Sequence, residues 1–198
     1  KPELYDKAAQ TLETLATKFP ESKYIPDALF YRGECSYMRQ KGKEAVGLYQ
    51  QLVDQHPKHR LRADAMYALG VAQEELGEHD AAGKTYAAFL KEFADHGLAT
   101  EVGMRLGETL FAAGDYEPAV DRFQAAAGVQ GFEFADWATV RQADALAQTG
   151  KHAEAAALYA SVPEKFPESE HLDRAALAGG KCYYLAGDLA QARSQLSR

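Results

Sequence analysis

Residues whose types and spacing could support catalysis or metal binding are few in this sequence. His56 and His59 lie three residues apart, but Pro57 separates them at an expected turn and no cysteine is near enough to complete a metal site. Glu74 and Glu75 offer adjacent carboxylates, yet nothing around them indicates a closed pocket. The sequence contains no Gly-rich phosphate loop, nucleophile elbow or His-Glu-x-x-His motif. We therefore expect a protein that is not an enzyme and that carries no metal and no cofactor.

Composition narrows the fold class. The 198 residues contain 29 acidic and 22 basic side chains, a formal charge of −7, whereas a protein that follows nucleic-acid phosphates would carry a basic stripe. One Ile and eight Val are too few for extensive β-sheet, while Ala, Leu, Glu, Gln and Lys favour helices. No apolar run approaches the roughly 18 residues that a membrane span needs. The composition predicts an all-α chain without a nucleic-acid partner and without a membrane span in these residues.

An internal repeat is the strongest signal in the sequence. A small residue recurs every 36 or 37 positions, at Gly33, Gly70, Gly107, Ala143 and Gly180. Seven residues after four of these comes a further glycine, at Gly77, Gly114, Gly150 and Gly187. Twelve residues after each small residue comes an alanine, and four further on an aromatic residue or leucine, at Ala45, Tyr49, Ala82, Tyr86, Ala119, Phe123, Ala155, Tyr159, Ala192 and Leu196. Ala8 and Leu12 continue the last two series at the N-terminus.

These positions have a physical reason if each repeat is a pair of antiparallel helices, a first helix A and a second helix B. A Gly or Ala in helix A lets helix B approach closely, because a larger side chain would hold the two apart. The second glycine ends helix A in a left-handed conformation. The alanine and the aromatic residue share one face of helix B, which packs against helix A. Proline then stops helix B in three repeats, at Pro20, Pro57 and Pro167.

This pattern resembles the tetratricopeptide repeat, whose motif is a small residue in helix A, Ala-x3-aromatic in helix B and a closing Pro. The resemblance implies an α-solenoid, a right-handed superhelix of antiparallel helix pairs, that binds proteins or peptides. The period of 37 exceeds the family's period of about 34, and the excess falls between a closing Pro and the next Gly, as between Pro57 and Gly70. We therefore expect helix A to begin about one turn early, capped near Ser22 or Ser169.

The register of the repeats predicts a single array over residues 1–198. Its parts are a half repeat at 1–25, complete repeats at 26–62, 63–99, 100–135 and 136–172, and a truncated repeat at 173–198. Natural arrays finish with capping helices that shield the last apolar face. We therefore expect these residues to be a stretch of a longer array, whose open ends could associate with another copy. Association of this kind, with an idle concave face, is an alternative function.

The resemblance also implies which side chains line the concave face of the A helices. Acids alternate there with aromatic residues, and the candidate partner-binding residues are Phe30, Glu34, Tyr37, Asp64, Tyr67, Glu101, Glu108, Phe111, Trp137 and Tyr184. Such a groove suits a basic peptide or helix, because the charges steer it and the rings supply buried area and cation–π contacts. The acids would repel the acidic C-terminal peptide that carboxylate-clamp members of the family bind. The alternative stays open that acids merely solvate these helices and that half of the rings pack between repeats.

The repeat at 100–135 departs most from the pattern. Gly131 replaces its closing proline, and Phe132, Phe134 and Trp137 follow within six residues. The segment is either a flexible joint that presents aromatic anchors to a partner or a place where rings fill the core between repeats. We favour the second interpretation.

A narrower resemblance rests on one short motif. Phe-Pro-x-Ser followed by Tyr or Leu and then Ala spans Phe19–Ala28 and, nearly unchanged, Phe166–Ala175. This motif is similar to bacterial envelope proteins, namely BamD-type outer-membrane assembly lipoproteins and the Tol–Pal-associated coordinator of cell division. It implies the periplasm or envelope rather than the cytoplasm. A solenoid attached to a catalytic or envelope-assembly domain outside these residues remains a further alternative.

Overall fold

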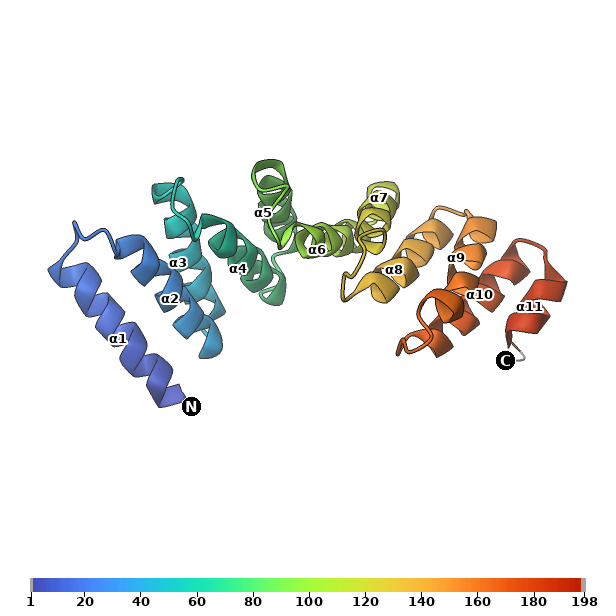
Figure 1. Ribbon diagram of the computed structural model, residues 1–198, viewed down its shortest axis with the longest axis horizontal. Coiled ribbons are helices and arrows are strands. Elements are labelled where there is room, and N and C mark those ends of the chain that lie inside the picture. Colours follow the sequence, from blue (N-terminus) through green and yellow to red (C-terminus); the bar gives the residue numbers. More distant parts are fainter. Residues whose placement is uncertain (1, 197–198) are drawn as a thin grey trace. The chain divides into compact units, whose positions relative to one another are not determined.

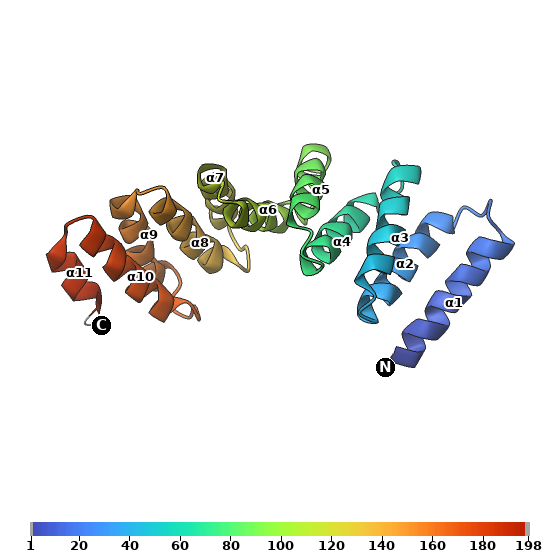
Figure 2. The same ribbon diagram turned by 180° about the vertical axis from the view of Figure 1, so that it is seen from behind.

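The computed structural model describes residues 2–196, and within them the chain is helical throughout apart from short connections (Figure 1, Figure 2). This range contains eleven helices and no strand, so the expected all-α fold is confirmed. The helices are α1 (Pro2–Lys18), α2 (Ile25–Met38), α3 (Gly42–Gln55), α4 (Arg62–Glu75), α5 (His79–Glu92), α6 (Ala99–Ala113), α7 (Tyr116–Ala127), α8 (Ala135–Gln148), α9 (His152–Lys165), α10 (Leu172–Leu185) and α11 (Leu189–Leu196). The chain divides into two compact units, Lys1–Ala99 and Thr100–Arg198. The organisation of residues 1–198 as a single array stays a prediction.

The first unit consists of helices that pack on their neighbours in the sequence. Contacts join α1 to α2, α2 to α3, α3 to α4 and α4 to α5. The expected A helices are α2 and α4, and the expected B helices are α1, α3 and α5, with consecutive helices joined by short turns (Figure 1). Tyr49, Leu52, Tyr86 and Phe89 of the B helices are fully buried and are among the largest side chains of the core of this unit.

The second unit repeats this arrangement with α6, α8 and α10 as A helices and α7, α9 and α11 as B helices. One core cluster joins Met104 of α6 and Phe123 of α7 to Ala138 of α8. A second cluster places Tyr159 of α9 between residues of α8 and Ala175 of α10. The repeat pattern in the sequence therefore yields the same three-helix packing, A–B–A, in both units.

The small residue of helix A packs directly against the ring of helix B, as predicted. A methyl group added at Gly33 would lie 2.4 Å from a ring carbon of Tyr49, and one added at Gly70 would lie 2.3 Å from the ring of Tyr86. Both distances are far shorter than a carbon–carbon contact of roughly 3.5–4.0 Å. Only a residue without a large side chain can therefore occupy this position of helix A.

The predicted left-handed ends of the A helices are also confirmed. Gly77 has φ of 76° and Gly150 has φ of 83°, values that are favourable for glycine alone. The first repeat departs from this rule, because Gln40 occupies the same position with φ of 59°. Gln40 follows Gly33 by seven residues, as Gly77 follows Gly70, so the backbone shape is kept although the glycine is absent.

The serine caps expected at the start of the A helices are wrong in detail. α2 begins after Tyr24 and α10 after His171, and neither residue makes a side-chain cap hydrogen bond. The serines act in the preceding turn, where the Ser22 hydroxyl accepts the Tyr24 N–H at 3.3 Å and the Ser169 hydroxyl accepts the His171 N–H at 3.1 Å. The serines therefore shape the turn into helix A rather than capping it.

Histidines occupy the same turn position in two other repeats. The Nδ1 atom of His59 accepts the N–H of Leu61 at 3.3 Å, and Nδ1 of His96 accepts the N–H of Leu98 at 3.2 Å. An imidazole nitrogen thus replaces a serine hydroxyl as the acceptor. This explains one member of the histidine pair noted in the sequence: His59 has a structural function in a turn.

The two cysteines, Cys35 and Cys182, are free and buried and act as small apolar residues of the core. Cys35 lies on α2 and Cys182 on α10, each two residues after the small residue of its repeat. Burial raises the pKa of both thiols. Neither therefore has the properties of an activated thiolate.

Candidate functional site

The candidate partner-binding residues all lie on the A helices of the two units. In the first unit they are Phe30, Glu34 and Tyr37 on α2 and Asp64 and Tyr67 on α4. In the second unit they are Glu101, Glu108 and Phe111 on α6, Trp137 on α8 and Tyr184 on α10. Nine of the ten are half-buried, whereas Tyr184 is 64% exposed. We call the surface formed by these side chains in each unit its A-helix face.

Two acids on the A helices of the first unit accept hydrogen bonds from tyrosines. The hydroxyl of the buried Tyr49 donates to Glu34 Oε1 at 2.5 Å, and the hydroxyl of Tyr37 donates to Glu75 Oε1 at 2.5 Å. Burial and the bond to Glu34 raise the pKa of Tyr49 well above its ordinary value. Glu34 therefore satisfies a buried phenol of the core in addition to any function at the surface.

Asp27 and Phe30 of α2 contact segments that follow α2 in the chain. Asp27, in the first turn of α2, pairs with Arg60 Nη2 at 2.5 Å and with His59 Nε2 at 3.3 Å. The ring of Phe30 lies 6.0 Å from that of Tyr49 and 5.3 Å from that of Tyr31. Asp27 therefore connects α2 to the segment that leads into α4, and Phe30 connects α2 to α3.

A run of alternating charges crosses the A helices of the second unit. Arg141 of α8 donates to both carboxylate oxygens of Glu108 on α6, at 2.8 and 2.6 Å, and to Asp144 at 2.8 Å. Asp144 also accepts from Arg174 of α10 at 2.7 Å and from the hydroxyl of Tyr159. We call Glu108, Arg141, Asp144 and Arg174 the charge ladder.

Aromatic rings enclose the guanidinium at the centre of the charge ladder. It lies 4.0 Å from the ring centroid of Phe111 and 5.6 Å from that of Trp137, and only 11% of the Arg141 side chain is exposed. Burial lowers the pKa of Arg141, but the hydrogen bonds and charges of Glu108 and Asp144 outweigh it and raise the pKa overall. Arg141 therefore stays charged and neutralises Glu108.

Sequence reasoning missed Arg141, which changes the character of the expected acidic face. A signal was present: Arg105 and Arg141 each stand two residues before the small residue of their repeats. Arg105 lies 3.2 Å from Glu101, so the two acids predicted on α6 are both paired with arginine. The A-helix face of the second unit is consequently zwitterionic rather than acidic.

An acidic and aromatic cavity lies beside this face, where the turns enter α8 and α10. Its volume is about 410 Å³, and its lining residues are Glu133, Phe134, Asp136, Trp137, Glu170 and His171. The rings of Trp137 and His171 lie 4.6 Å apart, and Phe134 is 40% exposed. We call this the Trp137 cavity. Three carboxylates, of Glu133, Asp136 and Glu170, and the accessible ring of Phe134 therefore line the same cavity.

The aromatic residues after Gly131 thus divide between the core and the surface. Phe132 and Trp137 pack against the α6–α8 core cluster, as the favoured interpretation predicted. Phe134 is instead exposed at the mouth of the Trp137 cavity. Gly131 itself has φ of 78°, which favours glycine, at the position where two other complete repeats have Pro57 and Pro167.

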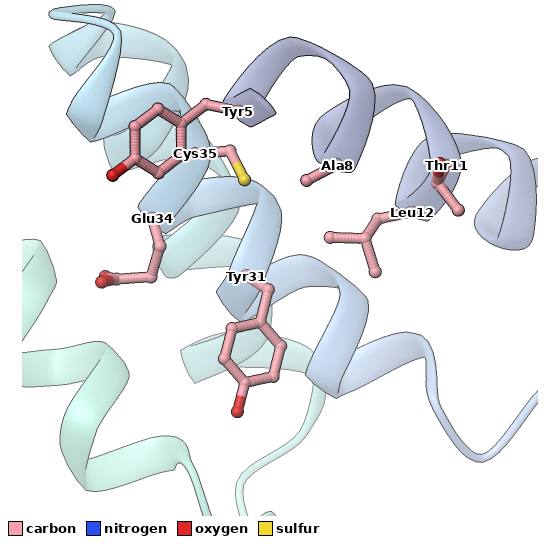
Figure 3. Close-up of a pocket in the computed structure, with 7 residues that line it drawn as sticks. All are labelled: Tyr5, Ala8, Thr11, Leu12, Tyr31, Glu34 and Cys35. Atoms are coloured by element: carbon pink, nitrogen blue, oxygen red, sulfur yellow. The ribbon is translucent and has the colours of Figure 1, made fainter. Parts of the chain in front are cut away.

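An apolar groove lies between α1 and α2 of the first unit (Figure 3). Its volume is about 560 Å³, and its lining residues are Tyr5, Ala8, Thr11, Leu12, Tyr31, Glu34 and Cys35. We call it the α1–α2 groove. Glu34 is the one acidic residue among those that line the groove. The rest of the groove lining is mostly apolar and suits apolar side chains.

The described residues show no arrangement for metal binding. No group of three or more His, Cys, Asp or Glu side chains within residues 2–196 could hold a metal ion. None of the helices described is long and apolar enough to cross a membrane.

Comparison with known proteins identifies the repeat. A family model described as the tetratricopeptide repeat matches residues 3–60, 43–96 and 104–170. A search of curated protein sequences gives no match.

Solved structures with the same fold have low sequence identity. The MamA protein aligns with a TM-score of 0.77 at 16% identity, covering 89% of this chain and 90% of that chain. YrrB, a tetratricopeptide protein with an unusual peptide-binding site, aligns with a TM-score of 0.76 at 17% identity, covering 96% and 90%. A tetratricopeptide repeat protein from Parabacteroides merdae aligns with a TM-score of 0.72 at 19% identity, covering 98% and 71%. At these identities the comparison establishes a common fold.

Proposed function

The chain belongs to the tetratricopeptide repeat family, and from this premise we propose that it is a non-catalytic scaffold that binds a partner protein through its A-helix faces. Stacked helical repeats offer extended surfaces to partners. YrrB, which shares the fold, has a peptide-binding site, and this supports a peptide or helix as the bound element.

The Trp137 cavity is the observation that carries a more specific proposal, a partner segment rich in Lys or Arg. The carboxylates of Glu133, Asp136 and Glu170 line it together with the accessible ring of Phe134. A long basic side chain would place its cationic end near the carboxylates and its aliphatic stem along the ring. The charge ladder does not offer this, because its carboxylates already have arginine partners.

The test compares two labelled peptides with the same aromatic residues, one rich in Lys and Arg and the other rich in Asp and Glu, by fluorescence anisotropy. We expect only the basic peptide to bind, with an affinity that falls as salt rises. The double variant Glu133→Lys/Glu170→Lys should weaken this binding by about tenfold or more, since both exposed carboxylates are reversed.

The matched control reverses two exposed acids on B helices, Asp121 of α7 and Glu164 of α9. The variant Asp121→Lys/Glu164→Lys has the same net charge as the cavity variant, so it reports the effect of overall charge alone. Equal weakening by the two double variants, or equal binding of the acidic peptide, would contradict the proposed cavity.

We also propose a location in the bacterial periplasm or envelope, on the Phe-Pro-x-Ser motifs alone. The comparisons support the tetratricopeptide family and give no support to the BamD-type or Tol–Pal-associated proteins in particular. Fractionation of the source cells, followed by detection with an antibody against this chain, tests the proposal. Recovery in the cytoplasmic fraction would contradict it.

A further inference from the structure

The turn that leads into α4 has an arginine at the repeat position where the turn that leads into α10 has an acid. Arg60 and Glu170 each stand ten residues before the small residue of the A helix that follows. Arg60 pairs with Asp27 of α2, with 2.5 Å between Nη2 and Oδ1. At this position the second unit therefore has a carboxylate where the first unit has a guanidinium.

The carboxylate that faces each turn is held in a similar way. Asp27 and Asp136 both lie in the first turn of an A helix, α2 and α8 respectively. His59 Nε2 lies 3.3 Å from Asp27 Oδ2. Ser169, at the repeat position of His59, donates to Asp136 Oδ2 at 2.5 Å. The two turns therefore share a positioned acid and differ in the residue that could pair with it.

Two exposed acids and a ring complete the Trp137 cavity. Glu133 stands at the arginine position of its own repeat, and both Glu133 and Glu170 are exposed. The Nε2 atom of His171 lies 3.8 Å from Glu170 Oε1, which is longer than a hydrogen bond. The ring of Phe134 is accessible at the mouth of the cavity. The cavity thus offers carboxylates and a ring, and its lining residues include neither Lys nor Arg.

We propose that the Trp137 cavity binds the guanidinium of an arginine of the partner segment, which supplies the cation that Arg60 supplies in the first unit. This inference rests on the proposed function and deepens it, because it chooses arginine over lysine. A guanidinium bonds to carboxylates through a planar fork of donors and stacks on aromatic rings, whereas an ammonium acts as a point charge. The carboxylates of the cavity provide the acceptors, and Phe134 provides the ring.

The chain holds its own guanidinium groups nearby with the same combination of acids and rings. Arg141 donates to Glu108 and Asp144 and lies over the Phe111 ring. Arg174 pairs with Asp144 at 2.7 Å, and its guanidinium lies 5.2 Å from the ring centroid of Trp137. Because Arg174 is paired with Asp144, the carboxylates of the cavity are left for a partner.

The test compares three labelled peptides by fluorescence anisotropy on the full chain. They share one sequence, with every basic residue as Arg, as Lys or as citrulline, which keeps the planar shape without the charge. The Arg peptide should bind about tenfold or more tightly than the Lys peptide, since hydrogen bonds to charged groups contribute that much, and the citrulline peptide should bind weakest.

The outcomes separate this inference from the proposed function. Equal or tighter binding of the Lys peptide would overturn the choice of arginine and leave a basic partner in place. If neither the Arg nor the Lys peptide binds, the proposed function fails and the inference fails with it. Binding of the citrulline peptide as tight as that of the Arg peptide would also overturn the inference, because the carboxylates would then contribute nothing.

A single substitution gives the second unit the arginine of the first. Glu170→Arg places a guanidinium beside Asp136, and it should fold normally because the Glu170 side chain is 86% exposed. The Arg peptide should lose about tenfold or more in affinity, and its advantage over the Lys peptide should disappear.

The matched control makes the same charge change at the other end of α9. Glu154→Arg alters an exposed acid in the first turn of that helix and should keep the preference for the Arg peptide. Equal loss of affinity in the two variants would show that overall charge determines binding. That result, or a preference for arginine that survives Glu170→Arg, would overturn the proposal.

Discussion

Two repeats, one in each unit, use the acid at the same repeat position in different ways. Glu34 in the first unit accepts a hydrogen bond from a neutral phenol, whereas Glu108 in the second unit shares two bonds with a guanidinium. Each acid follows the small residue of its A helix by one position. The difference comes from the neighbouring helices: Tyr49 reaches Glu34 from helix B of the same repeat, while Arg141 reaches Glu108 from the next A helix. An acid at this position therefore stabilises a hairpin in the repeat of Glu34 and the contact between hairpins in the repeat of Glu108.

Removal of Arg141 should have the largest effect on this comparison. Arg141→Met keeps the aliphatic stem between the rings but leaves Glu108 and Asp144 without their cation, and we expect a loss of about 3 kcal/mol in unfolding free energy. The matched variant in the first unit is Arg32→Met, whose partner Glu13 is 63% exposed at 3.3 Å, and it should lose about 0–1 kcal/mol. Urea unfolding followed by circular dichroism measures both. Equal shifts in the two midpoints would show that the ladder is no stronger than a surface pair.

Neutralising Glu34 and Glu108 one at a time should give a smaller difference in unfolding free energy between the two variants. Glu108→Gln loses charge-assisted bonds to Arg141 and should cost about 1.5–3 kcal/mol, since bonds to charged groups contribute that much. Glu34→Gln keeps an acceptor for the Tyr49 hydroxyl and should cost about 1 kcal/mol or less. The measurement is again the urea midpoint of each variant. A larger loss for Glu34→Gln than for Glu108→Gln would contradict the stronger bonding that we assign to the Glu108–Arg141 pair.

The sequence predicted the hairpins well because their determinants are local. Gly33 and Tyr49 belong to one repeat, sixteen residues apart, and their contact follows from the helix period and one turn. Arg141 and Glu108 are 33 residues apart and meet only because successive A helices stack. The position of Arg141, two residues before the small residue of its repeat, marks it as a recurrent side chain of helix A, but it does not identify Glu108 as the partner. The acidic face was therefore predicted without the cation that neutralises Glu108.

Alkaline pH should test a feature that the two units share. Burial raises the pKa of Tyr49 and of Tyr159, and each phenol also donates to a carboxylate. A phenol whose pKa is higher in the folded chain gives its full stabilisation below the unfolded pKa of about 10, and stability falls as pH rises above that value. The expected loss is about 1.4 kcal/mol per pH unit for each tyrosine.

Single variants assign this loss to each unit. Tyr49→Phe and Tyr159→Phe should each lower stability at neutral pH and reduce the slope above pH of about 10. Urea midpoints measured across the alkaline range provide the slope. A slope that is unchanged in both variants would show that other groups control alkaline unfolding.

The smallest expected effect concerns the end of helix A, where the first repeat differs from the others. Gln40 and Gly77 occupy equivalent positions, with φ of 59° and 76°. A residue with a β-carbon is less stable than glycine in this region by roughly 1 kcal/mol, although glycine loses more chain entropy on folding. We therefore expect Gln40→Gly to stabilise the chain by up to about 1 kcal/mol and Gly77→Ala to destabilise it by about the same amount. Thermal unfolding of the two variants measures this difference, and a destabilised Gln40→Gly would mean that the Gln40 side chain contributes more than its backbone strain removes.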